Sequence, residues 1–339
     1  MPNIDRMTGL LTFGSSGGGG GGGGTSGGGK FYKCVEVGDG TWAGCEWVLA
    51  DGVYSKSAAV TSGLVWTSVK PVLGKSYSAD ALVEVAGFAT ELNELSEKIQ
   101  SGYYTSDDLG SIFAVNHATF GTIEFEIVQV DKADIVGGRK HSITLMTKYM
   151  LRYIGFDGRE TYDAPRNRAS TGYNYWPESN IRQWLNSEDL APWFTPQNSY
   201  DQEPSSSYMS NSRGAYSTND GFMTGFDADF LKSVATVNNR VAIAEGNSAV
   251  SQDRFYLPSY TELSGEANMG VMEGTAFANF TLDKVGISSD IYDRCYYLRS
   301  AEPGSVGAVR RRMNDGAPRY DSDNAYQCNA GLVVCCVLY

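Results

Sequence analysis

DRFYLPSYTEL, residues 253–263, has the pattern of a β-strand that runs directly into a helix. Ser259 and Glu262 stand three residues apart, which is the spacing of a capping box. In such a box the serine side chain accepts a hydrogen bond from the backbone at the third helical residue, and the glutamate accepts one from the backbone of the serine. The stretch therefore predicts a strand followed by a helix that carries its own N-terminal cap.

Strand patterns flank this stretch. GTIEFEIVQV (121–130) places Ile123, Phe125 and Ile127 on one side and acidic residues on the other, as a half-buried strand does. The other expected elements are HSITLMTKYML (141–151), CYYLRS (295–300), VGAVRRRM (306–313), a turn at Asn314-Asp315-Gly316, a polar loop at 317–330 and a last strand, GLVVCCVLY (331–339).

Two short helices are expected between these strands. Ser179 is placed to cap a helix on which Ile181, Trp184 and Leu185 share one face, so these three side chains are scaffold. The range 227–234 predicts another helix with a buried apolar side.

Composition excludes several partners. Lys and Arg total 27 against 39 Asp and Glu, a net charge of −12, which argues against nucleic acid or an anionic membrane as a general partner. The longest uncharged apolar run, Gly331 to Tyr339, is far shorter than the roughly 20 residues that span a bilayer, so we expect no membrane insertion. The first residues lack the pattern of a secretory signal.

The chain begins with two unusual segments. Residues 14–29 are almost all glycine and serine, which predicts a flexible polyglycine tether, although a low-complexity expansion without a role has the same composition. Residues 1–13 cannot bury their apolar side chains alone, so we expect an N-terminal docking peptide whose contacts come from Met7, Leu10, Leu11 and Phe13.

Two further units precede the C-terminal part. Residues 30–86 contain short β-rich runs separated by turn residues and predict a small all-β module. Residues 87–107 predict a helix and connector, in which Phe88, Leu92, Leu95 and Ile99 have the seam spacing of a coiled coil. The seam suggests a homo-oligomer, for which we expect a trimer, but a helix packed on its own domain has the same spacing.

Patterns typical of catalysis and metal binding are missing. The chain has only two histidines, His117 and His141, and no C-x-x-C spacing, so we expect no zinc site, no Ser-His-Asp centre, no metal and no cofactor. The six cysteines are expected to be reduced and mostly buried, with a bridge between Cys34 and Cys45 as a second possibility. Asp321-Ser-Asp323-Asn324 lacks the other ligands of an EF-hand loop and is interpreted as a polar turn.

Carboxylates in aromatic-rich loops leave one enzymatic alternative open. Glycoside cleavage needs a pair of carboxyl groups about 5–10 Å apart, and spacing in sequence does not establish such a distance. We rank this alternative below binding and expect no enzyme. The candidates would be Glu160, Asp163, Asp201 and Glu203.

The segment 310–330 is the most suggestive surface. Tyrosines together with short polar side chains are typical of recognition loops, because they give contact area at low entropic cost and adaptable hydrogen bonding. Its candidate ligand-binding residues are Arg310, Arg311, Arg312, Asn314, Arg319, Tyr320, Asp321, Asp323, Asn324 and Tyr326.

Several motifs resemble an uncharacterised domain family of phages, prophages and bacterial surface proteins. They are SITLMTKYML (142–151), YWPESNIRQWLNS (175–187), GFMTGFDADFLKSV (221–234), DRFYLPSYTEL (253–263) and YYLRS (296–300). The resemblance implies an α+β fold of C-type-lectin-like type for residues 108–339, related to formylglycine-generating enzymes and to retroelement-diversified proteins. It also implies that the C-terminal loop is the ligand face.

Departures from the family pattern limit what it implies. Tyr296 and Tyr297 replace tryptophans, and the catalytic cysteines of formylglycine-generating enzymes are not recognisable. Glu302-Pro303-Gly304 lacks the calcium triplet of lectins. Within this resemblance, Arg299 is expected to form a buried or half-buried ion pair that orients the base of the loop.

Taken together, these features predict a bacteriophage virion structural protein of the tail or head fibre type, made in the host cytoplasm. Its N-terminus would contact other virion proteins, and its lectin-like head would bind a host-surface glycan or protein. A decoration protein without receptor recognition and a polysaccharide-degrading enzyme are the alternatives.

Overall fold

The structure is a computed structural model that describes residues 30–33, 45–49, 52–56, 64–67, 72–73, 96, 99–160, 168–243, 246–280, 295–313 and 319–339. The predicted docking peptide 1–13, the polyglycine run 14–29 and the turn at 314–316 lie outside these residues. So do three of the four seam residues, Phe88, Leu92 and Leu95. The described part is a mixed α/β structure with mostly strands and few helices.

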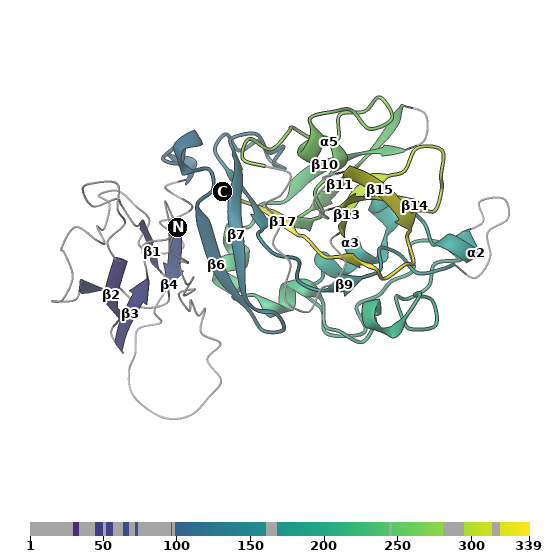
Figure 1. Cartoon of the computed structure of the whole chain (residues 1–339), viewed down its shortest axis with the longest axis horizontal. Helices are drawn as coiled ribbons and strands as arrows, with labels where there is room; N and C mark the ends of the chain where they lie inside the picture. The colour runs from purple at the N-terminus through teal and green to yellow at the C-terminus, as the bar shows by residue number, and fades with distance from the viewer. Residues whose placement is uncertain are drawn as a thin grey trace.

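One five-stranded antiparallel sheet has the order β12-β17-β8-β7-β6. Figure 1 labels β6, β7 and β17 of this sheet. Its strands are β6 (Ile112–His117), β7 (Gly121–Val130), β8 (Ile143–Thr147), β12 (Phe255–Tyr256) and β17 (Cys335–Leu338). Ile123, Phe125 and Ile127 of β7 are buried, which confirms the inward face predicted from the alternation.

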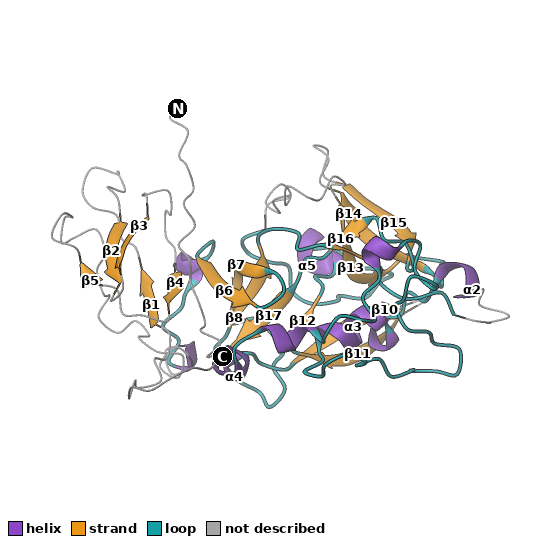
Figure 2. Ribbon diagram, turned by 90° about the horizontal axis from the view of Figure 1, so that it is seen from below, coloured by secondary structure: helices purple, strands orange, loops and turns teal. Residues whose placement is uncertain are grey.

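A second five-stranded sheet has the order β15-β14-β13-β16-β9 (Figure 2). It comprises β9 (Tyr153–Ile154), β13 (Cys295–Ala301), β14 (Ala308–Met313), β15 (Arg319–Asn324) and β16 (Ala330–Gly331). The pair β13 and β16 is parallel, and the other pairs are antiparallel.

Short elements complete the described structure. Strands β10 (Val237–Ile243) and β11 (Asn247–Asp253) form a separate hairpin. The helices whose bounds are described are α2 (Arg168–Thr171), α3 (Asn180–Leu185), α4 (Ala228–Ser233) and α5 (Tyr260–Ser264), with 3-10 turns η1 (Ser106–Asp108), η2 (Trp176–Glu178), η3 (Ser212–Gly214) and η4 (Phe222–Gly225).

Within 30–86 the structure describes only strand backbones. These are β1 (Lys30–Lys33), β2 (Cys45–Leu49), β3 (Gly52–Lys56), β4 (Leu64–Thr67) and β5 (Val72–Leu73). They pair antiparallel in the orders β1-β4 and β3-β2-β5. The all-β module stays a prediction, because most of this range is not described.

The C-terminal segment belongs to both large sheets. The sequence predicts one strand over 331–339, but the structure divides this segment into β16 and β17. Between them, the Leu332 carbonyl accepts a hydrogen bond from the Leu151 backbone, and the Val334 carbonyl accepts one from the Thr147 backbone. Residues 330–338 are buried throughout, so a continuous apolar run was the correct signal for a segment enclosed on all sides.

Helix α3 begins where it was predicted, but its cap differs. Ser179 is the N-cap residue, yet its hydroxyl donates to the Trp176 carbonyl at 2.9 Å instead of capping the helix. The Asp157 carboxylate accepts from the Asn180 backbone at 3.0 Å and satisfies the helix N-terminus from another part of the chain. The predicted apolar face of Ile181, Trp184 and Leu185 is buried.

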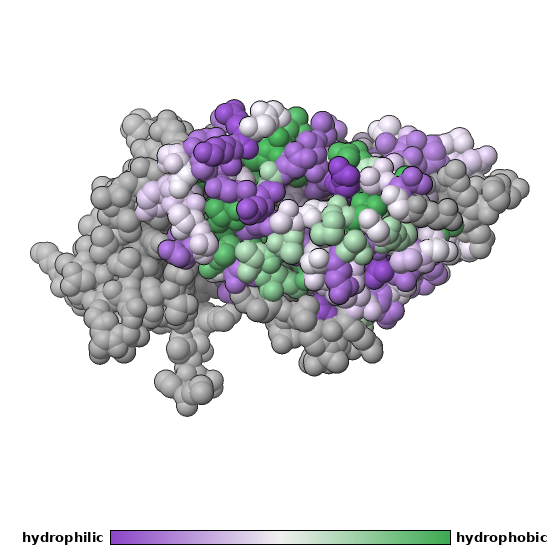
Figure 3. All heavy atoms as spheres, turned by 90° about the horizontal axis from the view of Figure 1, so that it is seen from above, coloured by the Kyte–Doolittle hydropathy of each residue, from purple (hydrophilic) through white to green (hydrophobic). Residues whose placement is uncertain are grey.

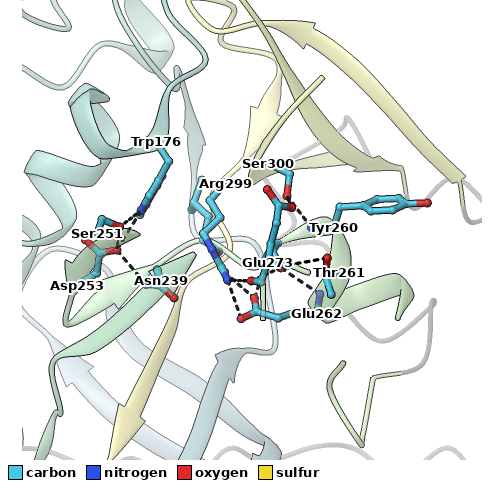
Figure 4. A network of polar contacts seen from close by, with 12 residues as sticks. Trp176, Asn239, Ser251, Asp253, Tyr260, Thr261, Glu262, Glu273, Arg299 and Ser300 are labelled. Atoms are coloured by element: carbon cyan, nitrogen blue, oxygen red, sulfur yellow. Dashed lines mark hydrogen bonds and ion pairs between the residues drawn. The ribbon is translucent and has the colours of Figure 1, made fainter. Parts of the chain in front are cut away.

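Asp253, the first residue of the stretch 253–263, connects the β10–β11 hairpin to the helical region. Its carboxylate accepts from Trp176 Nε1 at 3.0 Å and from Asn239 Nδ2 at 2.9 Å (Figure 4). Arg182 of α3 forms an ion pair with the same carboxylate, with 2.5 Å between Nε and Oδ1. A buried carboxylate with several donors is stable, so Asp253 holds three elements together.

Ile99 is the one seam residue that the structure describes, and it belongs to the core of the C-terminal region. Its burial agrees with the alternative in which this helix packs on its own domain. Because Ile99 packs inside its own chain, it gives no support for a seam between chains. The trimer stays a prediction.

His117, the last residue of β6, packs against the aromatic rings of Phe120, Phe222 and Phe226. Its Nδ1 accepts from the Thr119 and Phe120 backbones, so Nε2 carries the proton and donates to the Phe222 carbonyl at 2.9 Å. The ring of Phe226 contacts the imidazole edge-on at 4.7 Å. Burial lowers the pKa of His117 to about 4.

This lowered pKa predicts an acid-dependent loss of stability. The unfolded chain binds a proton at His117 near pH 6.5, whereas the folded chain resists it down to about 4, so stability is complete above 6.5 and falls between the two values. The loss amounts to about 3 kcal/mol at most. Urea denaturation of the His117→Gln variant across this range should show a smaller pH dependence than the parent, and an unchanged pH dependence would contradict the role of this histidine.

Candidate functional site

The segment 310–330 is mainly a β-hairpin, not a loop. The sequence predicted a polar loop over 317–330, but residues 319–324 form β15 and pair with β14. In this ladder Arg310 faces Ser322, Arg311 faces Asp321, and Arg312 faces Tyr320. The sequence of β15, RYDSDN, lacks the alternation of apolar and polar residues that predicts a strand. The strand lies at the edge of its sheet.

One face of the hairpin carries a charge network. The Arg311 guanidinium contacts Asp323 at 2.9 Å and Asp321 at 3.3 Å. Val309 and Tyr297 lie beside them on the ladder and are fully buried. The two aspartates are thus held by an arginine from the neighbouring strand.

The other face carries an aromatic and cationic cluster. Tyr260 of α5 contacts Tyr320 edge-on, with 4.6 Å between the ring centroids. The Arg310 guanidinium lies over the Tyr260 ring at 4.3 Å, a cation–π contact. The Tyr260 hydroxyl donates to Glu266 at 2.5 Å. We call Tyr260, Arg310 and Tyr320 the hairpin cluster.

The two phenols of the hairpin cluster are neutral at physiological pH. The hydrogen bond to Glu266 raises the pKa of Tyr260, with burial adding to it. Burial raises the pKa of Tyr320 to about 12, against the opposing charge of Arg312. Both side chains therefore present a neutral aromatic ring, while the Tyr260 hydroxyl is engaged by Glu266 and the Tyr320 hydroxyl is buried without a hydrogen-bond partner among the described residues.

Arg312 does not belong to the exposed surface. Its side chain is fully buried, lies over the Tyr320 ring at 5.2 Å and donates to the Met313 carbonyl. Arg312 shares a face of β14 with Arg310, but its side chain is covered and packs on the Tyr320 ring, so the structure leaves it no exposed surface for the predicted ligand contact.

Of the remaining predicted ligand-binding residues, some make contacts within the protein and others lie outside the described residues. Tyr326 is half-buried, lies under the Arg159 guanidinium at 5.2 Å and accepts from Gln327 Nε2. The Asn324 carbonyl accepts from the Tyr297 hydroxyl at 3.3 Å. Asn314 and the side chain of Arg319 lie outside the described residues. The structure thus brings Arg310 and Tyr320 together and adds Tyr260, which sequence reasoning had placed only in a helix.

The base of the hairpin is held by a buried ion pair (Figure 4). Arg299 of β13 donates from Nη1 and Nη2 to the two carboxylate oxygens of Glu262 at 2.6 and 2.8 Å. Arg299 is 1% exposed. The predicted ion pair of Arg299 is confirmed, and its partner is the glutamate of the capping box.

Glu262 therefore serves two elements at once. Its carboxylate accepts from the Ser259 backbone at 2.8 Å, and its own backbone donates to the Ser259 hydroxyl at 3.1 Å, so the predicted capping box is complete. Because the same carboxylate binds Arg299, the start of α5 is fixed against β13.

A second contact positions Tyr260 itself. Its backbone donates to the Ser300 hydroxyl at 2.8 Å, and that hydroxyl donates to Glu273 (Figure 4). Glu273 also accepts from the Ala242 backbone at 2.8 Å, and burial raises its pKa. Tyr260 is thus held at the hairpin by a chain of buried hydrogen bonds.

The carboxylates of the enzymatic alternative take part in a network of hydrogen bonds. Asp201 accepts from the Gln197 backbone and from Asn180 Nδ2, while Asn198 donates to Glu160 at 3.2 Å. Burial, together with the charge of Asp201, raises the pKa of the nearby Asp157. Glu203 is exposed. Asp163 lies outside the described residues.

The next features are the potential metal ligands and the cysteines of the described ranges. No group of three or more His, Cys, Asp or Glu side chains there is arranged to hold a metal ion. Cys295, Cys328, Cys335 and Cys336 are free and buried, as predicted for reduced cysteines. Among the helices that the structure describes, none has the length and apolar character to cross a membrane.

Comparison with known proteins gives one match. A family model described as "Domain of unknown function (DUF6273)" matches residues 141–338, more than half of the chain. No curated protein and no solved structure matches the chain. The matched range includes α3, α5, β13 and the hairpin. It leaves out β6 and β7, which complete the first sheet.

The Arg299 ion pair predicts a large effect of mutation. Arg299→Met leaves the Glu262 carboxylate buried without its partner, which should reduce the free energy of unfolding by about 3–5 kcal/mol. Urea denaturation measures this loss. The Arg299→Lys variant keeps the positive charge without the bidentate geometry, so its free energy of unfolding should fall by less.

Glu188 offers the matched control for that measurement. It pairs with Arg254, but its side chain is 60% exposed, so Glu188→Gln should change stability by less than about 1 kcal/mol. Equal effects of Arg299→Met and Glu188→Gln would contradict a central role for the buried pair.

Proposed function

The chain belongs to this family of unknown function, and we propose that it is a bacteriophage virion structural protein that displays a receptor-binding head. The head is C-type-lectin-like, on the resemblance of its motifs, and it attaches the particle to a glycan or protein of the host surface. The protein is made in the host cytoplasm and acts by binding, not by catalysis.

The hairpin cluster carries this proposal. Tyr260, Arg310 and Tyr320 come from a helix and two strands, and their backbones are fixed by the ladder and by the buried Arg299–Glu262 pair. Side chains on such a frame lose little further entropy on binding, which favours recognition by a small surface. Tyrosine and arginine are also the residue types that most often dominate binding energy.

The rest of the described surface mixes polar and apolar side chains. On the face drawn in Figure 3, hydrophobic residues form small patches between hydrophilic ones. The most exposed large apolar side chains of the described residues are spread over different elements: Leu190, Val250, Met272, Val306, Val136 and Tyr200. Apolar side chains scattered in this way are normal on a protein surface, so the proposal rests on the hairpin cluster.

The N-terminal sequence supplies attachment and reach. Residues 1–13 would bind other virion proteins through their apolar side chains, and the glycine run would let the head move without imposing an orientation. Several copies on one particle, in a trimer or a larger array, would turn weak single contacts into strong attachment.

Binding to host cells tests the proposal. Fluorescently labelled full-length protein should bind the bacterium in which the corresponding phage grows, and Tyr260→Ala should weaken that binding about tenfold or more through loss of the ring contacts to Arg310 and Tyr320. Tyr200→Ala, which removes an exposed tyrosine on another loop, is the control and should bind normally.

Two results would contradict receptor recognition. If the parent protein binds no cells while still entering particles, it is a decoration protein. If it binds but releases reducing ends from a host polysaccharide, it is an enzyme. Thermal unfolding of each variant confirms that the fold is intact.

The docking peptide has its own test. Deletion of residues 1–13 should leave the head folded and able to bind cells but exclude the protein from purified particles, as measured by quantitative mass spectrometry. If the deletion variant enters particles normally, residues 1–13 do not attach the protein to the particle.

A further inference from the structure

A polar cavity lies beside the Arg299 ion pair, away from the exposed side of the hairpin. It has a volume of about 160 Å³ and is bounded by the ends of β7 and β8, the start of β10, β12, α5 and the segment 272–277. A cavity of about this size accommodates a ring such as benzene. The cavity is therefore large enough for a small ligand or for one end of a larger one.

The inner wall of the cavity is unusually polar. Burying polar groups costs free energy unless each is hydrogen-bonded, so a cavity that served only packing would be lined with apolar side chains. Here seven polar residues that are at least nine-tenths buried contribute to the lining: Gln129, Thr144, Asn239, Tyr256, Glu262, Glu273 and Arg299.

Arg299 keeps one donor unused. Its Nη atoms bind Glu262, the Leu257 carbonyl and the Glu273 carbonyl. Its Nε is buried and has no hydrogen-bond partner among the residues that the structure describes. Tyr256 lines the same cavity, and burial, with the nearby charge of Glu262, raises the pKa of its phenol. The tyrosine is therefore a neutral donor at physiological pH.

The rim of the cavity adds positive charge. Lys132 and Arg240 are exposed, and neither forms an ion pair within the described ranges. Inside the cavity, Glu262 binds Arg299 and Glu273 accepts from three donors. At the rim, Asp134 accepts from Asn238 and is exposed, so it keeps its negative charge. The two unpaired cations outnumber this one carboxylate among the rim residues of the lining, which favours a negatively charged ligand.

We propose that this cavity binds a small carboxylate, either a free organic acid or the acid group of a sugar. The carboxylate would accept a hydrogen bond from the Tyr256 hydroxyl, beside the buried charge of Arg299, whose guanidinium lies over the Tyr256 ring at 5.3 Å. Lys132 and Arg240 would attract it at the rim. Met272, which is 51% exposed at the rim, would cover the apolar part of the ligand. This site is separate from the hairpin cluster and does not depend on the proposed attachment role.

Three probes distinguish the sources of the carboxylate. Saturation-transfer NMR and calorimetry on the full chain should detect D-glucuronate, benzoate or both, and should detect D-glucose at least tenfold more weakly, because glucose lacks the acid group. Binding of glucuronate without benzoate assigns an acidic sugar, and the reverse assigns a free organic acid. Equal binding of glucose and glucuronate, or no binding of either acid, would overturn the proposal.

Variants connect binding to the named residues. Tyr256→Phe removes one hydroxyl at nearly constant volume and should weaken acid binding at least fivefold with an unchanged melting temperature. The double variant Lys132→Ala and Arg240→Ala should weaken it similarly and reduce its salt dependence. Lys140→Ala, an exposed lysine outside the cavity, is the matched control. Unchanged affinity in both test variants would show that the acids bind elsewhere.

Discussion

The bidentate contact between Arg299 and Glu262 is the constraint on which the C-terminal region depends. It joins the strand β13 to the helix α5 inside the protein, where both side chains are buried. A buried ion pair adds little net stability, because desolvation offsets the attraction, but only one geometry satisfies both partners. The pair therefore specifies how the helix and the strand meet.

That geometry positions the candidate recognition surface. With α5 fixed, Tyr260 lies against Tyr320 of the hairpin, and Arg310 lies over its ring. On the opposite face Arg311 holds two aspartates, so much of the hairpin's charge is paired within the hairpin itself. A surface ordered in this way presents mixed polar and aromatic groups at low entropic cost. The cavity beside Arg299 shares this frame but opens on different residues.

The two large sheets are made into one body by the C-terminal segment. Residues 330–338 leave the second sheet at β16 and enter the first at β17, with every side chain buried. The hairpin thus rests on a sheet that is connected through the backbone to the other half of the core. Movement of the hairpin relative to the core would have to break this packing, which favours a rigid site on a rigid scaffold.

Sequence alone determined the features that depend on neighbours along the chain: the alternation of β7, the apolar face of α3 and the capping box at Ser259 and Glu262. It also indicated that Arg299 needs a buried partner. Only the tertiary structure decided that Arg312 is covered, that Asp157 rather than Ser179 binds the start of α3, and that 319–324 is a strand. Periodicity and helix caps depend on residues that are close together in sequence, so their spacing predicts them. Burial and strand pairing depend on segments that are far apart in sequence. Tyr260 illustrates the difference, because its helix could be predicted but its contact with Tyr320, sixty residues later, could not.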